Sequence, residues 1–208
     1  MRLANFVGDG SKIVIYDTTP MTGACRVWWM FRTMGHEEVR VLNGGLKKWK
    51  GEGRPLEDNQ ARQRTPRHFT PVFNAGLVRD KSEVKALIDH PAIQIVDARA
   101  AARFEGTAAE PRAGLRSGHI PSARNVPFTR LVNPDGTLKS ASELQDIFAA
   151  AKVDPDGPVV ASCGSGVMAG VIALALAVLC RPDAAVYDGS WSEWGADPAL
   201  PIETGPAR

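Results

Sequence analysis

One segment of the sequence carries residues whose types and spacing could perform covalent chemistry. Cys163 follows an apolar run over residues 159–162 and precedes three small residues, Gly164, Ser165 and Gly166. Main-chain N–H groups of small residues can curl around a sulfur atom, and the start of a following helix favours an anion. Thiols in such settings have pKa values lowered to roughly 3.5–7.5. The segment therefore predicts an anionic sulfur that reagents can reach.

Two further cysteines have no such setting. Cys25 and Cys180 lie in apolar segments typical of helices, so we interpret both as packing residues. The three cysteines are widely spaced, with no CxxC pair and no His at metal-ligand spacing, which argues against a disulfide framework or a zinc site. We expect one useful thiol in a reducing, cytoplasmic setting, with no metal or organic cofactor.

Length and composition restrict the class of protein. The 208 residues suffice for one large or two small domains, and 44% of them are hydrophobic. A formal charge of +2 predicts neither a nucleic-acid partner nor a membrane surface. The apolar run over residues 167–180 is too short to span a bilayer, and residues 1–9 lack the pattern of a secretory signal.

Predicted strands and helices alternate along the chain. We predict a helix that starts at Ser140, with Glu143 completing a capping box, and a long loop over residues 101–118. The Cys163 helix is predicted to end at Arg181. The other helices are predicted over residues 24–34, around 46–49 and over 81–89, and the strands over 12–16, 39–42, 93–96, 125–126, 159–162 and 185–187. This alternation predicts an α/β fold with a parallel sheet flanked by helices.

An internal repeat divides the chain into two related copies. IVIYD and VRVLNGGLKKW in the first part correspond to VVASC and AAVYDGSWSEW in the second, so Asp17 falls at the position of Cys163. A polar segment with two prolines, residues 52–67, separates the copies. We therefore expect a partial, inactive copy over residues 1–54, a linker over 55–75 and a catalytic domain over 76–208.

A second thiolate chemistry uses a similar loop. Cysteine phosphatases need an Arg that closes the loop and binds phosphate through two hydrogen bonds. Here the closing positions are Val167, Met168 and Ala169, and no Arg or Lys lies between Cys163 and Arg181. Phosphate hydrolysis is therefore disfavoured.

The whole pattern resembles the rhodanese superfamily. CGSGVMA is similar to the CGSGVTA loop of its mercaptopyruvate sulfurtransferase branch, and the segment from VDARAAARFEG to GHIPSARNVPF is similar to the family's pattern. Thiosulfate-specific members carry basic residues in the loop (CRKGVTA), which suit a dianion. The resemblance implies sulfur transfer from 3-mercaptopyruvate, through a Cys163 persulfide, to a thiol acceptor such as thioredoxin, or to cyanide.

The resemblance also implies roles for individual residues. Arg103 and Arg112 would bind the carboxylate of the donor, and Ser165 would help to move the proton that the departing pyruvate takes up. The remaining substrate-binding positions are in the loop itself: Gly164, Gly166, Val167 and Met168. Four further residues are expected to have structural roles: His119 to shape a loop, Asp97 and Arg99 to tie a strand end to a loop, and Asp188 to cap the turn before Trp191.

The sequence departs from the family pattern in two places. Met168 stands where the family has Thr, which predicts lower activity or a different acceptor. No strand ending in VDA and no HIPGA segment precedes Ser11, so the first sheet is expected to expose unpaired backbone. A naturally shortened product, a misassigned start and a partner chain over that edge all remain open.

Two alternative functions also remain open. The first is a thiosulfate sulfurtransferase, which differs in the sulfur donor. The second is a sulfur-carrier or sensor module with little turnover, because the incomplete copy lacks the relay residues that full-length members have.

Overall fold

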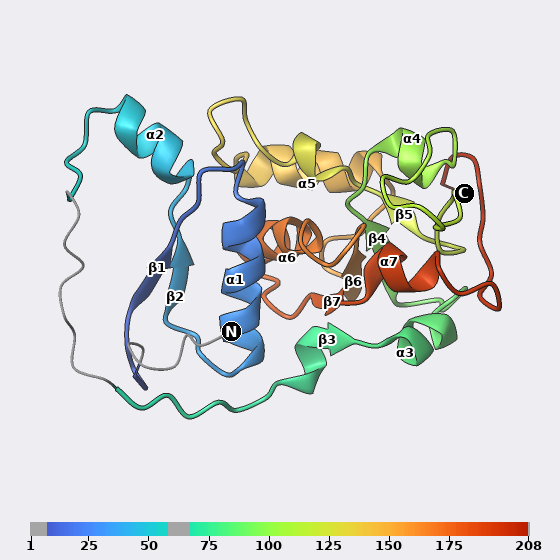
Figure 1. The fold of residues 1–208 in the computed structure, drawn as a ribbon, viewed down its shortest axis with the longest axis horizontal. Coiled ribbons are helices and arrows are strands. Elements are labelled where there is room, and N and C mark those ends of the chain that lie inside the picture. The colour runs from blue at the N-terminus through green and yellow to red at the C-terminus, as the bar shows by residue number, and fades with distance from the viewer. Residues whose placement is uncertain (1–7, 58–66, 208) are drawn as a thin grey trace.

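The computed structural model describes residues 8–57 and 67–207 (Figure 1). In chain order its elements are β1 (Ile13–Ile15), α1 (Thr22–Thr33), β2 (Val39–Val41), α2 (Gly45–Gly51), η1 (Ala75–Leu77), β3 (Val78–Arg79), α3 (Lys81–Ala86), β4 (Gln94–Asp97), α4 (Ala101–Phe104), β5 (Arg124–Asn125), η2 (Phe128–Arg130), α5 (Ala141–Ala150), β6 (Val159–Ser162), α6 (Ala169–Val178), β7 (Ala185–Tyr187) and α7 (Ser190–Trp194).

A five-stranded parallel sheet forms the larger part of the molecule. Its strand order is β3-β7-β6-β4-β5, so β6 lies in the middle and delivers Cys163 to the carboxyl edge. The pairing of Asp97 with Ser162 brings the end of β4 beside the end of β6. Parallel strands covered on both faces are apolar along their whole length, and all four residues of β6 are buried. The predicted α/β architecture is confirmed.

Helices cover both faces of this sheet. On one face, α5 and α6 contribute Leu144, Phe148 and most of the residues of α6 to one apolar core. On the other face, Trp191 and Trp194 of α7 are buried in a second core. Ser140 and Glu143 form the predicted capping box at the start of α5. The two tryptophans therefore pack the core.

A two-stranded parallel sheet, β1 with β2, forms the smaller part. Helix α1 lies between this sheet and α6, as Figure 1 shows. Among the described residues β1 pairs with no strand other than β2, and Val14 and Tyr16 are 61% and 57% exposed. The expected unpaired backbone is therefore present at this edge.

The two copies repeat the same backbone geometry. Ile15 pairs with Val41 as Ala161 pairs with Val186, which is the register that the sequence repeat requires. The amide of Leu46 donates to the Asp17 carbonyl at 2.9 Å, and the amide of Trp191 donates to the Cys163 carbonyl at 3.0 Å. The first copy is thus a true partial repeat with a carboxylate at the position of the thiol.

Three sequence predictions differ from the structure. The predicted loop over residues 101–118 begins with the short helix α4, because AARF is rich in helix-favouring residues. Helix α6 ends at Val178, before Arg181, and Cys180 follows with a φ of +65°, a left-handed conformation that ends helices. Cys180 is exposed, so its assignment as a packing residue is wrong.

No helix in the described ranges is both long and apolar enough to cross a membrane. Within the same ranges, no group of three or more His, Cys, Asp and Glu side chains could hold a metal ion.

Candidate active site

The candidate site is the loop that joins β6 to α6. Cys163 ends the strand, residues 164–168 form the loop, and the helix begins at Ala169. The Cys163 amide donates to the Ser190 hydroxyl at 3.1 Å, and that hydroxyl lies 4.0 Å from Sγ of Cys163. Ser190 comes from the turn after β7, so two neighbouring strand ends together fix the position of the sulfur.

Hydrogen bonds from helix α7 hold the two carbonyl groups at the start of the loop. The Cys163 carbonyl accepts the Trp191 amide at 3.0 Å. The Gly164 carbonyl accepts the Ser192 amide at 2.9 Å and the Ser192 hydroxyl at 2.5 Å. Because a trans peptide is planar, its N–H points away from its carbonyl. Helix α7 therefore directs the next two N–H groups, those of Gly164 and Ser165, away from itself.

The N–H groups of the loop remain available. None of the amides of residues 164–168 has a hydrogen-bond acceptor among the described residues. Gly166 is buried and the other four residues are half-buried, so these five consecutive donors lack a protein partner close to the surface. Successive amides of this kind form a concavity that binds anions. The loop can therefore stabilise a thiolate or a persulfide.

The side chains of the loop differ in their surroundings. Ser165 and Val167 are half-buried, and the Ser165 hydroxyl has no hydrogen-bond partner among the described residues. Met168 packs partly against the apolar core and occupies the N-cap position of α6 without a side-chain hydrogen bond. A Thr at this position could accept an amide of the first turn, whereas Met cannot.

Both predicted arginines lie near Gly164, Arg103 directly and Arg112 through Ser192. The guanidinium of Arg103 is so close that a Cβ placed on Gly164 would lie 3.0 Å from its Nη2. Arg112 donates at 2.5 Å to the Ser192 hydroxyl, which in turn donates to the Gly164 carbonyl. Arg112 is exposed, and the side chain of Arg103 is 21% exposed. Two cations from one loop thus flank the residue next to Cys163.

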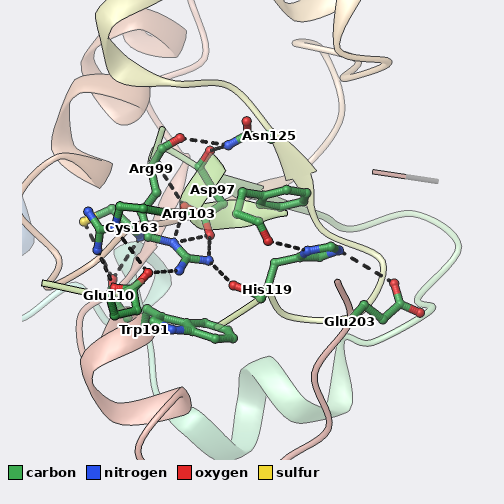
Figure 2. Close-up of polar contacts among 12 residues, drawn as sticks. Asp97, Arg99, Arg103, Glu110, His119, Asn125, Cys163, Trp191 and Glu203 are labelled. Atoms are coloured by element: carbon green, nitrogen blue, oxygen red, sulfur yellow. Dashed lines mark hydrogen bonds and ion pairs between the residues drawn. The ribbon is translucent and has the colours of Figure 1, made fainter. Parts of the chain in front are cut away.

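A buried chain of charges orients Arg103. Figure 2 shows Arg99 between Asp97 and Glu110, and Glu110 between Arg99 and Arg103. Arg99 donates to Asp97 at 2.7 Å and to Glu110 at 2.8 Å, and Arg103 donates to Glu110 at 2.5 Å. The side chains of Arg99 and Glu110 are 0% and 1% exposed. The predicted link from strand end to loop is confirmed, and it extends to Arg103.

Replacing Glu110 with Gln is expected to weaken both the fold and the site. The change leaves the buried Arg99 short of a counter-charge and frees Arg103 from its carboxylate. Breaking a buried ion pair from one side costs about 3–5 kcal/mol. Chemical denaturation should show a loss of this size. A matched control is Glu143→Gln, at an exposed ion pair with Lys139, where we expect a loss under about 1 kcal/mol. Equal losses in the two variants would contradict the network.

The sulfur itself is covered. Cys163 has no exposed surface in this structure, so the prediction of a reachable sulfur is wrong for this conformation. Cys163 packs in the apolar core, and Arg103 lies over the adjacent Gly164. A donor must therefore displace part of this cover before it meets the thiol. Cys25 is also fully buried, and burial raises the pKa of its thiol, which disfavours its thiolate.

Two other sequence predictions have opposite outcomes. His119 is structural, as predicted: its Nδ1 lies 2.8 Å from the Phe104 carbonyl and its ring stacks on Phe104. Burial lowers the pKa of His119 and so favours its neutral form. Asp188 does not cap α7, which has no side-chain cap; its carboxylate instead accepts from Arg26 of the first copy. The prediction for Asp188 is wrong because a distant residue of the sequence competes for it.

Sequence reasoning missed Ser190, Ser192 and Glu110 as supports of the site. A signal existed for the first two, because the repeat alignment places the turn after β7 beside the Cys163 strand end. For Glu110 the signal was weak, since a Glu in a Gly- and Pro-rich loop is usually exposed.

The sequence of this chain is similar to a known family and to proteins of known function. Residues 2–52 and 80–197 match the family described as the rhodanese-like domain. The chain is 45% identical to the 3-mercaptopyruvate sulfurtransferase of Escherichia coli, over 95% of this chain and 69% of that protein. It is 39% identical to the mitochondrial thiosulfate/3-mercaptopyruvate sulfurtransferase 1 of Arabidopsis thaliana, over 95% of this chain and 58% of that one.

A solved structure shows the same fold. The Tum1 protein from Saccharomyces cerevisiae superimposes with a TM-score of 0.84 at 28% identity, covering 96% of this chain and 72% of that one.

Proposed function

Because this chain belongs to the rhodanese-like family, we propose that it is a sulfurtransferase that takes sulfur from 3-mercaptopyruvate and carries it on Cys163 as a persulfide. The observation that supports this proposal best is the row of amides without a protein acceptor over residues 164–168, directly after Cys163. The same cradle serves the thiolate before the reaction and the persulfide after it, since both are anions.

The proposed reaction is a double displacement. The Cys163 thiolate attacks the sulfur of mercaptopyruvate, a new S–S bond forms and the C–S bond breaks. Its electron pair leaves on pyruvate as the enolate, which takes up the proton that the donor sulfur loses. Ser165, half-buried in the same loop, would carry that proton. The persulfide then passes its outer sulfur to a thiol acceptor, such as thioredoxin or a small thiol.

Arg103 and Arg112 bind the carboxylate of the donor in this proposal. Both flank Gly164, so a carboxylate that binds them brings the attached sulfur to the mouth of the loop. Glu110 already holds Nε and Nη2 of Arg103, which leaves Nη1 for the donor. Arg103 also lies over the Cys163 loop, so a donor that binds Arg103 helps to uncover the sulfur. Gly164, Gly166, Val167 and Met168 form the rest of the substrate site.

Thiosulfate is the second candidate donor, because one relative carries both donors in its name. The loop from Gly164 to Met168 contains no cation, and this neutrality favours a donor with a carboxylate over a small dianion.

Steady-state kinetics with the two donors test the proposal. We expect kcat/KM for mercaptopyruvate to exceed that for thiosulfate by about tenfold or more, and Arg112→Gln to lower it by about tenfold, the value of one charge-assisted hydrogen bond. The control is Arg79→Gln, whose guanidinium bonds the carbonyls of residues 75, 76 and 78 at the edge strand β3. Faster turnover of thiosulfate would make it the donor. One persulfide per chain without turnover would instead indicate a carrier or sensor.

The proposal assigns residues 1–54 to a partial copy without a nucleophile, 55–75 to a linker and 76–208 to the catalytic domain. It places the enzyme in the cytoplasm, where reducing conditions keep Cys163 a thiol. The chain spans 58% of the Arabidopsis thaliana relative and 69% of the Escherichia coli relative.

A further inference from the structure

The first copy reaches the Cys163 loop through one side chain. Arg26 of α1 donates from Nη1 to the Gly166 carbonyl at 3.3 Å, and the same nitrogen donates to the Asp188 carboxylate. Gly166 is 140 residues away in the sequence and lies in the centre of the loop. The guanidinium of Arg26 also lies over the Trp29 ring, 4.6 Å from its centroid, which fixes its plane.

The backbone of α1 is held in register with the loop. A Cβ on Gly170, in the first turn of α6, would lie 3.0 Å from the amide nitrogen of Arg26 and 3.1 Å from the carbonyl of Cys25. The two helices therefore touch through their backbones at this point. Since helices are stiff over one turn, this contact sets the position of the Arg26 Cα relative to Gly166. Arg26 is not a surface cation that happens to be near the loop.

Gly166 is shaped to fit this contact. Its φ is +77°, and an added Cβ would lie 2.6 Å from the Asp188 carbonyl and 2.9 Å from Nη1 of Arg26. Gly166 thus packs against both the turn after β7 and Arg26 of the first copy, and no space remains there for a side chain.

The hydrogen bond from Arg26 adds a third loop carbonyl that is held by a neighbouring element. Helix α7 holds the carbonyls of Cys163 and Gly164, and it belongs to the same copy as the loop. The carbonyl of Gly166 is held instead by Arg26. Its peptide carries the N–H of Val167, which must point away from Arg26 because the peptide is planar and trans. One donor of the anion cradle is therefore aimed by a residue of the inactive copy.

We propose that Arg26 is a positioning residue for sulfur transfer, which holds the Gly166–Val167 peptide so that its N–H serves the anion on Cys163. The inference rests on the proposed sulfurtransferase function, and it gives the copy without a nucleophile a part in the site. Arg26 does not touch the donor; it acts through the backbone. Asp188 keeps the guanidinium in place between the two copies.

The test compares Arg26→Ala with Arg32→Gln. Arg32 is on the same helix, lies 5.2 Å from the centroid of the Trp28 ring and donates to the Pro182 carbonyl, so it also links the copies but does not touch the loop. We expect Arg26→Ala to lower kcat for mercaptopyruvate by about tenfold, below the loss for a directly contacting oxyanion donor. KM should stay within about twofold, because Arg103 and Arg112 are unchanged. Arg32→Gln should change neither. A loss of kcat that is equal in both variants would overturn the proposal.

A second readout does not require that the chain be a sulfurtransferase. In a Cys180→Ser background, which removes the exposed thiol, iodoacetamide labelling of the Cys163 peptide follows the stabilised anion directly. We expect labelling near neutral pH to slow by about fivefold to tenfold in Arg26→Ala and not in Arg32→Gln. If both proteins label at the same rate, Arg26 has no positioning role. If labelling differs but no donor is turned over, the proposed function fails while the role of Arg26 stands.

A double variant distinguishes a positioning role of Arg26 from neutralisation of the Asp188 charge. If Arg26 acted by neutralising Asp188, then Arg26→Ala/Asp188→Asn would label as fast as Asp188→Asn. We expect the double variant to stay as slow as Arg26→Ala, because the Gly166 carbonyl is still unheld. Recovery in the double variant would overturn the positioning role.

Discussion

Cys163→Ser is expected to abolish sulfur transfer, with a loss of at least about a thousandfold in kcat/KM. We propose that the free amides of residues 164–168 stabilise a sulfur anion, and a serine hydroxyl does not ionise near neutrality, so we expect neither attack nor a persulfide. The assay is pyruvate release from mercaptopyruvate with a thiol acceptor. The fold should remain intact, because serine is close to cysteine in size and Ser190 can bond its hydroxyl.

The other two cysteines provide matched controls. Cys180→Ser changes an exposed side chain and should leave both activity and stability unchanged. Cys25→Ser buries a hydroxyl in the core and should cost about 1–3 kcal/mol of stability, with activity retained in the folded protein. Activity that survived in Cys163→Ser, or that disappeared in Cys180→Ser, would contradict the assignment of the nucleophile.

Gly166→Ala is expected to have the second largest effect, a loss of kcat of about a hundredfold or more. The added Cβ would overlap the Asp188 carbonyl at 2.6 Å, and this neighbour is backbone that cannot move aside. Either the loop or the turn after β7 must shift, and the Cys163 and Val167 amides shift with it. Turnover of mercaptopyruvate and the thermal midpoint of unfolding should be measured together.

Gly10→Ala is the control for backbone strain. Gly10 has a φ of +74°, close to the +77° of Gly166, but nothing lies within 4 Å of its added Cβ. Alanine in this conformation costs roughly 1–2 kcal/mol at either site. Gly10→Ala should therefore lose stability but keep its activity. If Gly166→Ala lost no more activity than Gly10→Ala, the close fit of the loop against Asp188 would have no functional role.

The fold was largely predictable because local rules decide it. The β6 and β7 strands have the predicted bounds, since an apolar run between Gly, Pro and Asp residues leaves little freedom for its ends. The capping box at Ser140 fixed the start of α5. The segments that match between the two copies predicted the repeat, with Asp17 at the position of Cys163. The repeat in turn predicted the strand register.

The parts that were not predictable depend on contacts between distant residues. Nothing local to Asp188 indicates that Arg26 takes its carboxylate, and nothing local to Glu110 indicates that two arginines bury it. The cover over Cys163 has the same origin, because the apolar core in which it packs is built from distant parts of the sequence. Spacing predicts which residues gather at a sheet edge but not how they pair there.

Persulfide formation on Cys163 is the most direct test of a cradled, anionic sulfur that accepts and passes on sulfur. The full chain is mixed with mercaptopyruvate, and its intact mass and then its peptide masses are measured. The account predicts a gain of one sulfur atom on the peptide that holds Cys163, and its loss when a thiol acceptor is added. No gain in mass, or a gain on the peptides of Cys25 or Cys180 instead, would contradict it.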